Sequence, residues 1–112
     1  MDFFAQVNTS NNFNEDVTRE KHLPLIQVED VGNDKHKIIV DVGGGKHPND
    51  IDHWIQWVEV RLDDMFVGRA EFSAKVMEPV VEFVVNCKGT CNISALARCN
   101  KHGLWLTTAK CS

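Results

Sequence analysis

The chain has 112 residues, enough for one hydrophobic core and too few for two domains. Its formal net charge is -4 and its pI is about 5.7, and no basic stripe is interleaved with aromatic residues, so nucleic acid is not an expected partner. No apolar stretch approaches the roughly 20 residues of a membrane helix, and the start at Met1–Phe4 lacks the basic residues of a signal peptide. The expected location is therefore cytoplasmic, with no membrane partner.

Residues 1–18 are rich in Asn, Asp and Thr and show no sustained apolar periodicity after Phe4. This composition predicts a mobile or loosely docked N-terminal arm. The folded domain is expected to cover residues 19–112.

From His22 onward the pattern predicts seven short strands. Runs of apolar, β-branched and aromatic residues alternate with turns rich in glycine, such as Gly32-Asn33-Asp34 and Gly43-Gly44-Gly45. The predicted strands cover residues 23–28, 37–42, 54–62, 66–74, 80–86, 92–98 and 104–109. No segment has a helical period and there is no internal repeat. The pattern therefore predicts an all-β fold, an antiparallel sandwich of two sheets.

Five side chains suited to a transition metal fall at the ends of these strands or in the loops between them. They are His22 before the first strand, His47 and His53 in one long loop, and Cys99 and His102 between the last two strands. A thiolate with several imidazoles is too soft for magnesium or calcium and suits iron, copper or zinc. Because structural zinc is usually satisfied by four ligands, five candidates indicate a higher coordination number with one position open for reaction.

The residues alone leave two other kinds of metal site possible. A closed zinc site in a structural or interaction domain could use Cys87, Cys91, Cys99 and His102, although the seven-residue middle spacing is short for a zinc ribbon and three histidines would stay unused. A cupredoxin-like copper site would typically need two histidines, one cysteine and a weak axial ligand such as methionine.

The four cysteines could also be interpreted as two disulfides. If Cys99 and its neighbour His102 are metal ligands, three cysteines remain: Cys87, Cys91 and Cys111. Because three cysteines cannot all pair as disulfides, this count favours a reducing compartment. A Cys87–Cys91 disulfide remains an alternative under oxidation.

The segments that carry the candidate ligands resemble a known family. The stretches EKHLP at 20–24, KHPNDIDHW at 46–54 and CNKHGLW at 99–105 are similar to the iron-binding segments of the superoxide reductases, the desulfoferrodoxin and neelaredoxin group. Between them, Val67-Gly68-Arg69 with Glu71-Phe72, and Glu78-Pro79 followed by Phe83, also look like that family. The similarity runs from about Arg19 to Trp105 and implies an immunoglobulin-like sandwich.

The resemblance implies an enzyme with one iron ion per chain. His22, His47, His53 and His102 would lie in a plane around the iron, Cys99 would bind axially, and the sixth position would face solvent. The implied reaction is the one-electron reduction of superoxide, with two protons, to hydrogen peroxide and without release of dioxygen. Thiolate donation opposite the open position would favour this reduction. The electron would come from rubredoxin or a similar small electron-transfer protein, and the implied assembly is a homotetramer, or otherwise a dimer.

Glu20 and Lys21 correspond to the family's Glu-Lys pair beside the open position. The resemblance implies that Lys21 attracts superoxide and helps to position water for protonation, and that Glu20 occupies the sixth site in the resting ferric state. On charge pattern alone the two would be a solvated pair beside a strand. Because no cysteine precedes Cys87, the four-cysteine iron domain of the larger desulfoferrodoxins is not expected, which leaves one iron centre.

Lysines directly precede four of the five histidines. Lys21, Lys46 and Lys101 could form a local positive collar around the metal in an acidic chain and so speed encounter with an anion. The fourth, Lys35, precedes His36, which matches no family motif and is expected to be solvent-exposed and uninvolved.

Overall fold

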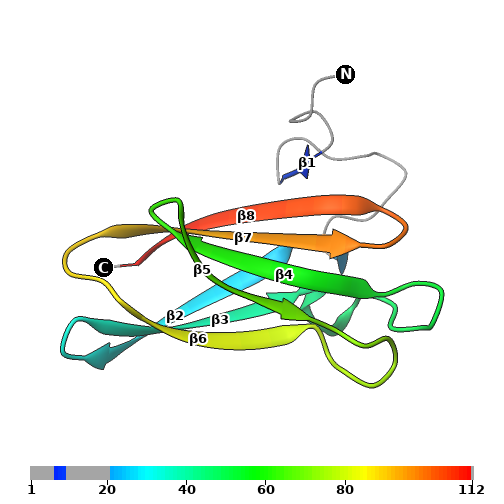
Figure 1. Ribbon diagram of the computed structural model, residues 1–112, viewed down its shortest axis with the longest axis horizontal. Helices are drawn as coiled ribbons and strands as arrows, with labels where there is room; N and C mark the ends of the chain where they lie inside the picture. The colour runs from blue at the N-terminus through cyan, green and yellow to red at the C-terminus, as the bar shows by residue number, and fades with distance from the viewer. Residues whose placement is uncertain (1–6, 10–20, 112) are drawn as a thin grey trace.

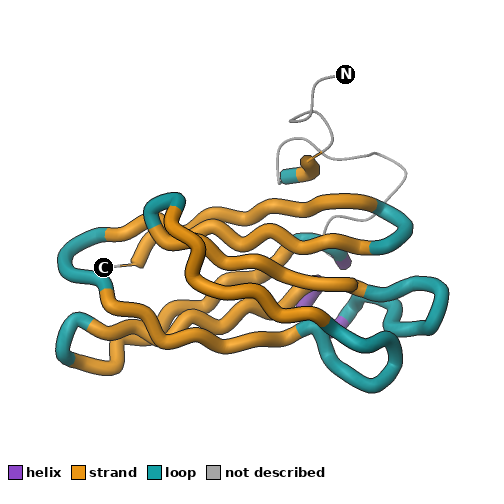
Figure 2. Tube along the Cα trace, in the orientation of Figure 1, coloured by secondary structure: helices purple, strands orange, loops and turns teal. Residues whose placement is uncertain are grey.

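The computed structural model describes residues 7–9 and 21–111, and these form two sheets packed face to face (Figures 1 and 2). The strands are β1 (Val7–Asn8), β2 (Pro24–Gly32), β3 (Lys35–Val42), β4 (Ile55–Leu62), β5 (Met65–Glu71), β6 (Val80–Asn86), β7 (Cys91–Cys99) and β8 (Gly103–Cys111), with a short 3-10 turn, η3 (Gly43–Gly45), after β3. One sheet has the order β1-β8-β7-β4-β5 and the other β2-β3-β6. The predicted all-β sandwich is confirmed.

The core lies between the two sheets because alternate residues of each strand face inward. On β3 the inward positions are Ile38, Val40 and Val42, each fully buried, and on β7 they include Ile93, Ala95 and Ala97. The apolar series gives way to histidine or cysteine near the ends of these strands: His36 begins the inward row of β3, and Cys91 and Cys99 bound that of β7. Each end of the sandwich therefore presents side chains that can bind metals or undergo redox chemistry.

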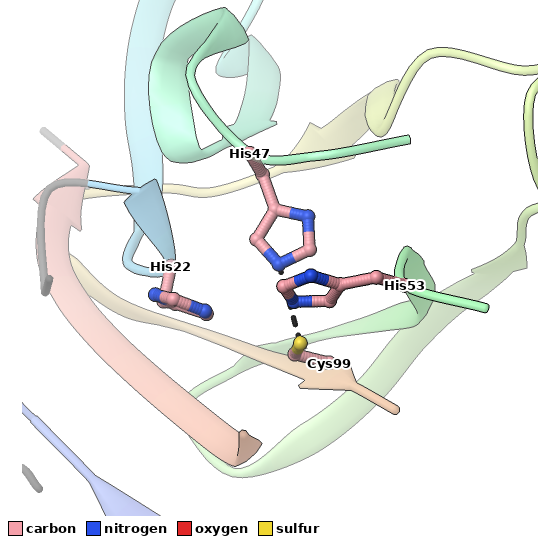
Figure 3. Close-up of side chains that lie close together, drawn as sticks. All are labelled: His22, His47, His53 and Cys99. Carbon is pink, nitrogen blue, oxygen red and sulfur yellow. Dashed lines mark hydrogen bonds between the residues drawn. The ribbon is translucent and has the colours of Figure 1, made fainter. Parts of the chain in front are cut away.

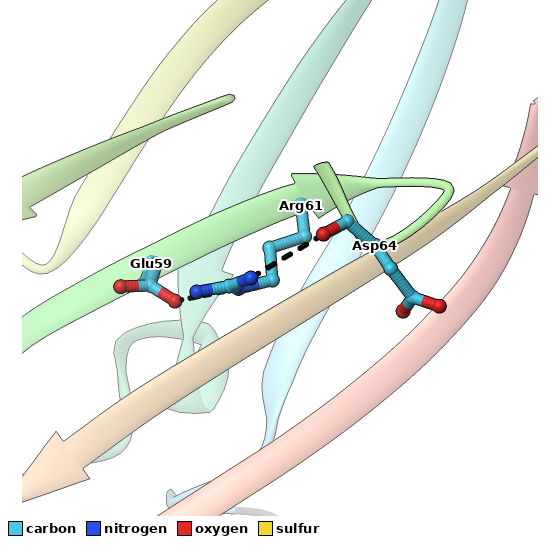
Figure 4. Close-up of polar contacts among 3 residues, drawn as sticks. All are labelled: Glu59, Arg61 and Asp64. Atoms are coloured by element: carbon cyan, nitrogen blue, oxygen red, sulfur yellow. Dashed lines mark hydrogen bonds and ion pairs between the residues drawn. The ribbon is translucent and has the colours of Figure 1, made fainter. Parts of the chain in front are cut away.

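The β4–β5 hairpin is a tight turn held by one arginine. Asp63 and Asp64 both have positive φ, as a two-residue hairpin turn requires. Arg61 donates from Nε to Glu59 at 2.8 Å and from Nη1 to the backbone oxygen of Asp64 at 3.3 Å (Figure 4). These exposed contacts lie away from the loops that carry the candidate ligands.

Part of the segment predicted as an arm is a short strand. Val7 and Asn8 pair in parallel with Leu104 and Trp105 of β8, and the Asn8 side chain donates to the Leu104 oxygen at 3.0 Å. The remainder of residues 1–18 lies outside the described residues. Over the described ranges, no helix is long and apolar enough to cross a membrane.

The expectation that His36 is exposed is wrong, because its side chain is only 5% exposed. The sequence pattern places the start of this strand at residue 37, whereas β3 begins at Lys35, so His36 takes an inward-facing position. Nearby, Cys87 and Cys91 form a disulfide, and Cys99 and Cys111 are free thiols. The disulfide is the alternative that the sequence favoured less, because three cysteines remain once Cys99 is assigned to the metal site.

Candidate metal centre

The structure brings the five predicted ligands together at one end of the sandwich. His22 precedes β2, His47 and His53 come from the loop between η3 and β4, and Cys99 and His102 flank the turn from β7 to β8. Ligand atoms of His22, His47, His53 and Cys99 all lie within 4.8 Å of one another (Figure 3). Loops collected at the end of a rigid sandwich are well placed to carry function.

The four imidazoles form a closed ring of neighbours. Successive ring centroids are 4.8 Å apart for His22 and His47 and 4.9 Å for His47 and His53. The circuit continues with 5.0 Å for His53 and His102 and 4.9 Å for His102 and His22. Each neighbouring pair is edge-on, with interplanar angles from 72° to 86°. Four side chains in this arrangement surround a common centre as the sides of a square do.

The hydrogen bonds indicate which ring nitrogens face that centre. His47 donates from Nδ1 to the Pro48 oxygen at 2.6 Å, which leaves Nε2 directed at Cys99 Sγ, 3.2 Å away. His102 presents Nδ1, which is 3.0 Å from His22 Nε2 and 3.8 Å from Cys99 Sγ. Nε2 of His53 is buried and has no hydrogen-bond partner among the described residues. A cation at the centre could be bound by all of these nitrogen and sulfur atoms at once.

Burial tunes these side chains for metal binding. Burial, with smaller contributions from the neighbouring imidazoles, lowers the pKa of His47 to about 4, so at pH 7 this ring is neutral and keeps a lone pair. The pKa of His53 is lowered for the same first reason, with contributions from His102 and Lys101. Burial raises the pKa of the Cys99 thiol, although backbone amides of Lys101 and His102 partly offset this. A bound cation is therefore what would deprotonate the thiol.

Two residues, Asn100 and Trp105, hold the ligand loops in place. Asn100 accepts from the Trp54 amide at 2.9 Å and donates to the Asp52 oxygen at 2.9 Å, which ties the His53 loop to the turn after β7. The indole of Trp105 stacks on His22 with centroids 4.8 Å apart and donates to the His102 oxygen at 3.1 Å. Sequence reasoning assigned neither residue a role, because Asp52, Trp54 and His22 are distant in the chain and the motif alone does not reveal these contacts.

A glycine allows the first ligand segment to approach the second. Gly43 has φ of +79° and donates to the Leu23 oxygen at 3.0 Å. A Cβ at this position would lie 2.2 Å from the Lys21 oxygen and 3.2 Å from Cβ of His47. Residue 43 therefore has to be glycine for the segment before β2 to lie against the His47 loop.

The structure separates the residues of the alternative closed zinc site. Cys91 and Cys99 are the first and last residues of β7, and eight steps of about 3.3 Å place them about 26 Å apart. Cys87 is bonded to Cys91 and so lies at the same far end. These four residues cannot share one ion.

The charged residues predicted beside the metal are only partly described. Glu20 lies outside the described residues, so its predicted place at the centre stays a prediction. Lys21, Lys46 and Lys101 are exposed. Of these, Lys101 is close enough to contribute to lowering the pKa of His53.

The sequence matches the family model described as desulfoferrodoxin over residues 14–108. The chain belongs to the desulfoferrodoxin family. One curated relative is a desulfoferrodoxin homolog from Archaeoglobus fulgidus. It is 42% identical over 90 residues, which cover 80% of this chain and 64% of the relative. The chain thus spans somewhat less than two thirds of that protein.

Other relatives match over most of their length. A superoxide reductase from Pyrococcus abyssi is 38% identical over 96 residues, which cover 77% of this chain and 83% of the relative. Among solved structures, the superoxide reductase (neelaredoxin) from Ignicoccus hospitalis superposes with a TM-score of 0.82 at 28% identity, covering 98% of this chain and 97% of that one. The family likeness therefore extends over the whole sandwich, including the loops of the metal centre.

Proposed function

We propose that this chain reduces superoxide to hydrogen peroxide at a single iron ion held by His22, His47, His53, His102 and Cys99. The proposal rests on the family membership together with the ring of four imidazoles and the thiol beside it. It takes the reaction from the relatives named superoxide reductase. The chain is an enzyme of that class, and the ligand set is our assignment.

The donor set supports iron. Four imidazole nitrogens and one sulfur exceed the four ligands that satisfy structural zinc, and they combine the imidazole and thiolate donors that suit iron. Nε2 of His53 is buried and has no hydrogen-bond partner among the described residues, and a bound ion would satisfy it. When bound, ferrous iron supplies the electron, and the Cys99 thiolate increases the electron density available for that transfer.

The remaining parts of the reaction fall to side chains of this chain. The exposed amines of Lys21, Lys46 and Lys101 would attract the superoxide anion in a molecule that is acidic as a whole. Lys21 would also help to place the water that delivers protons, and Glu20 would occupy the sixth position in the resting ferric state. His22 is held by its stack on Trp105, which keeps one side of the centre fixed while the substrate approaches.

Re-reduction requires an external donor, because each superoxide that is reduced takes one electron from the iron and the proposed reaction returns none. We propose rubredoxin or a similar small electron-transfer protein. We further propose a homotetramer, with a dimer as the alternative, and a cytoplasmic location, where the thiol of Cys99 stays reduced.

Metal analysis with a visible spectrum of the oxidised protein tests this function. We expect one iron per chain and a thiolate-to-ferric charge-transfer band that bleaches on reduction and returns on addition of superoxide. His47→Ala should weaken iron binding at least about tenfold, since even the loss of an outer partner of a ligand has effects of that size. Cys87→Ser, at the far end of β7, should keep both iron and band. A colourless protein that holds only zinc and is unaffected by His47→Ala would contradict the proposal.

The lysine collar makes a separate prediction about rate. If Lys46 contributes to the local field, Lys46→Ala should lower the second-order rate constant for superoxide several-fold at low ionic strength, and added salt should reduce the wild-type rate toward that of the variant. Stopped-flow or pulse-radiolysis measurements over a salt series measure both effects. Lys88→Ala, an exposed lysine beside the distant Cys87, is the matched control and should leave the rate unchanged. A wild-type rate that is independent of salt would eliminate the collar.

A further inference from the structure

A second cluster of potential metal ligands lies at the opposite end of the sandwich. His36 is the second residue of β3, Cys87 follows β6, Cys91 begins β7 and Cys111 ends β8. The ligand atoms of His36, Cys87 and Cys111 all lie within 4.8 Å of one another, and all three side chains are buried. Cys91 adds a third sulfur, since it is bonded to Cys87 and pairs with Cys111 across β7 and β8.

The surroundings of His36 indicate that an ion binds in this cluster. Its side chain is 5% exposed, and neither Nδ1 nor Nε2 has a hydrogen-bond partner among the described residues. An unsatisfied buried polar group costs about 1–3 kcal/mol, and the next inward positions of β3 are filled by isoleucine and valine without that cost. A metal ion bound beside the three sulfurs would satisfy one of these two nitrogens, which gives the buried imidazole a role as a ligand.

We propose that His36, Cys87, Cys91 and Cys111 hold a zinc ion when the Cys87–Cys91 pair is reduced. Three thiolates and one imidazole are a standard closed tetrahedral zinc set, and the Cys-x3-Cys spacing falls in the usual range for the first ligand pair. The turn between these two cysteines is exposed at Lys88, Gly89 and Thr90, so it can adjust as the sulfurs separate. The site needs no residue of the iron centre.

An entry path is present beside the cluster. A pocket of about 450 Å³ is lined by His36, Cys87 and Gly89 and by two acidic residues, Asp30 and Asp34. Their carboxylates favour the approach of a divalent cation. Asp34 is also fixed to the site, because its backbone oxygen accepts from the amide of Cys87 at 2.8 Å.

The structure shows the oxidised form of this site. Two thiolates and hydrogen peroxide, with two protons, give one disulfide and two waters: the S–S bond forms, the O–O bond breaks, and each sulfur gives up one electron. Zinc loses two of its four ligands and leaves. The peroxide can come from the proposed reductase reaction, and only this source of oxidant rests on the proposed function.

Zinc titration of the iron-loaded protein in its reduced and oxidised forms tests the site. The protein is reduced, freed of reductant without air and titrated with Zn²⁺ against a chromogenic chelator, while iron is measured in parallel. We expect one tightly bound zinc per chain with iron retained, and release of that zinc with loss of two thiols after one equivalent of hydrogen peroxide. The assignment would be overturned if the zinc affinity were the same before and after disulfide formation. It would also be overturned if zinc displaced the iron, or if the second site preferred iron to zinc.

The variants His36→Val and Cys111→Ala separate a ligand from a merely structural residue. Each should lower zinc affinity at least about 100-fold, because loss of an outer partner alone costs 10–100-fold. With chelator present, His36→Val should unfold at the same temperature as wild type or higher, since it removes the unsatisfied imidazole. An unchanged zinc affinity in a folded His36→Val variant would refute the role of His36. A protein that keeps its iron and its activity but binds no zinc when reduced would refute the second site and leave the proposed function intact.

Discussion

Cys99→Ser should abolish most superoxide reduction, with a fall of at least about 100-fold in the second-order rate constant. Cys99 is fully buried, and its sulfur lies 3.2 Å from His47 Nε2 and 3.8 Å from His102 Nδ1, so no other described sulfur can replace it at the centre. A serine hydroxyl donates far less electron density than a thiolate, and thiolate donation is what favours the reduction. Loss of a direct ligand should exceed the 10–100-fold effects seen for outer partners.

The measurement combines stopped-flow kinetics with iron content and the visible spectrum. The charge-transfer band should disappear in Cys99→Ser even in the fraction of protein that still holds iron. Ala97→Ser is the matched control, because it adds a hydroxyl at a fully buried position two residues earlier on β7. That variant should keep rate and colour. A rate within twofold of wild type for Cys99→Ser would remove the thiolate from the mechanism.

Gly43→Ala should destabilise the fold by about 3 kcal/mol or more and also weaken iron binding. The added methyl group would lie 2.2 Å from the Lys21 oxygen and 2.9 Å from its carbonyl carbon, both backbone atoms that cannot rotate away. Positive φ adds about 1–2 kcal/mol for a residue with a side chain, and steric overlap in a packed site typically adds 1–3 kcal/mol. Relief requires the His22 segment to move away from His47.

Gly45→Ala separates the two contributions. Gly45 has φ of +81° in the same turn, but no atom lies within 4 Å of a Cβ built there. It should therefore lose only about 1–2 kcal/mol and keep its iron. Denaturant unfolding of the metal-free proteins gives the stability difference, and iron titration gives the affinity. Equal losses for the two variants would mean that backbone conformation alone, and not the approach of residue 21, accounts for the requirement.

The sequence pattern predicted the sandwich well and its strand ends less well. Runs of β-branched residues between glycine turns locate seven strands, since each run supplies the side chains with which one strand faces the core. The start of β3 was missed because Lys35, His36 and Lys37 look like a solvated turn, whereas pairing with β2 and β6 extends the strand through them. The two-residue β1 could not be predicted, because its parallel pairing with β8 is a long-range contact without a local pattern.

The motifs indicated the candidate ligands, but not how they are arranged. Residue types and family likeness identify His47 and Cys99, yet the edge-on ring of imidazoles follows only from how three loops meet. Gly43 showed that limit most clearly: within a run of three glycines, nothing in the sequence distinguishes the one that permits close approach. The cluster around His36 was missed for a related reason, since its members come from β3, β7, β8 and the residue after β6 and share no motif.

The order of the ligands along the chain bears on how the enzyme acquires its metal in a cell. During synthesis His22, His47 and His53 emerge well before Cys99, which reaches the centre only when β7 pairs with β4. Until then the chain offers imidazole nitrogens without the geometry of the completed centre, and geometry is what can oppose the general preference of such ligands for divalent copper over ferrous iron. If the metal is iron, as proposed above, its correct loading depends on completing the larger sheet first. Copper excess during growth should trap newly made chains in a mismetallated form, whereas chains that folded beforehand should resist it.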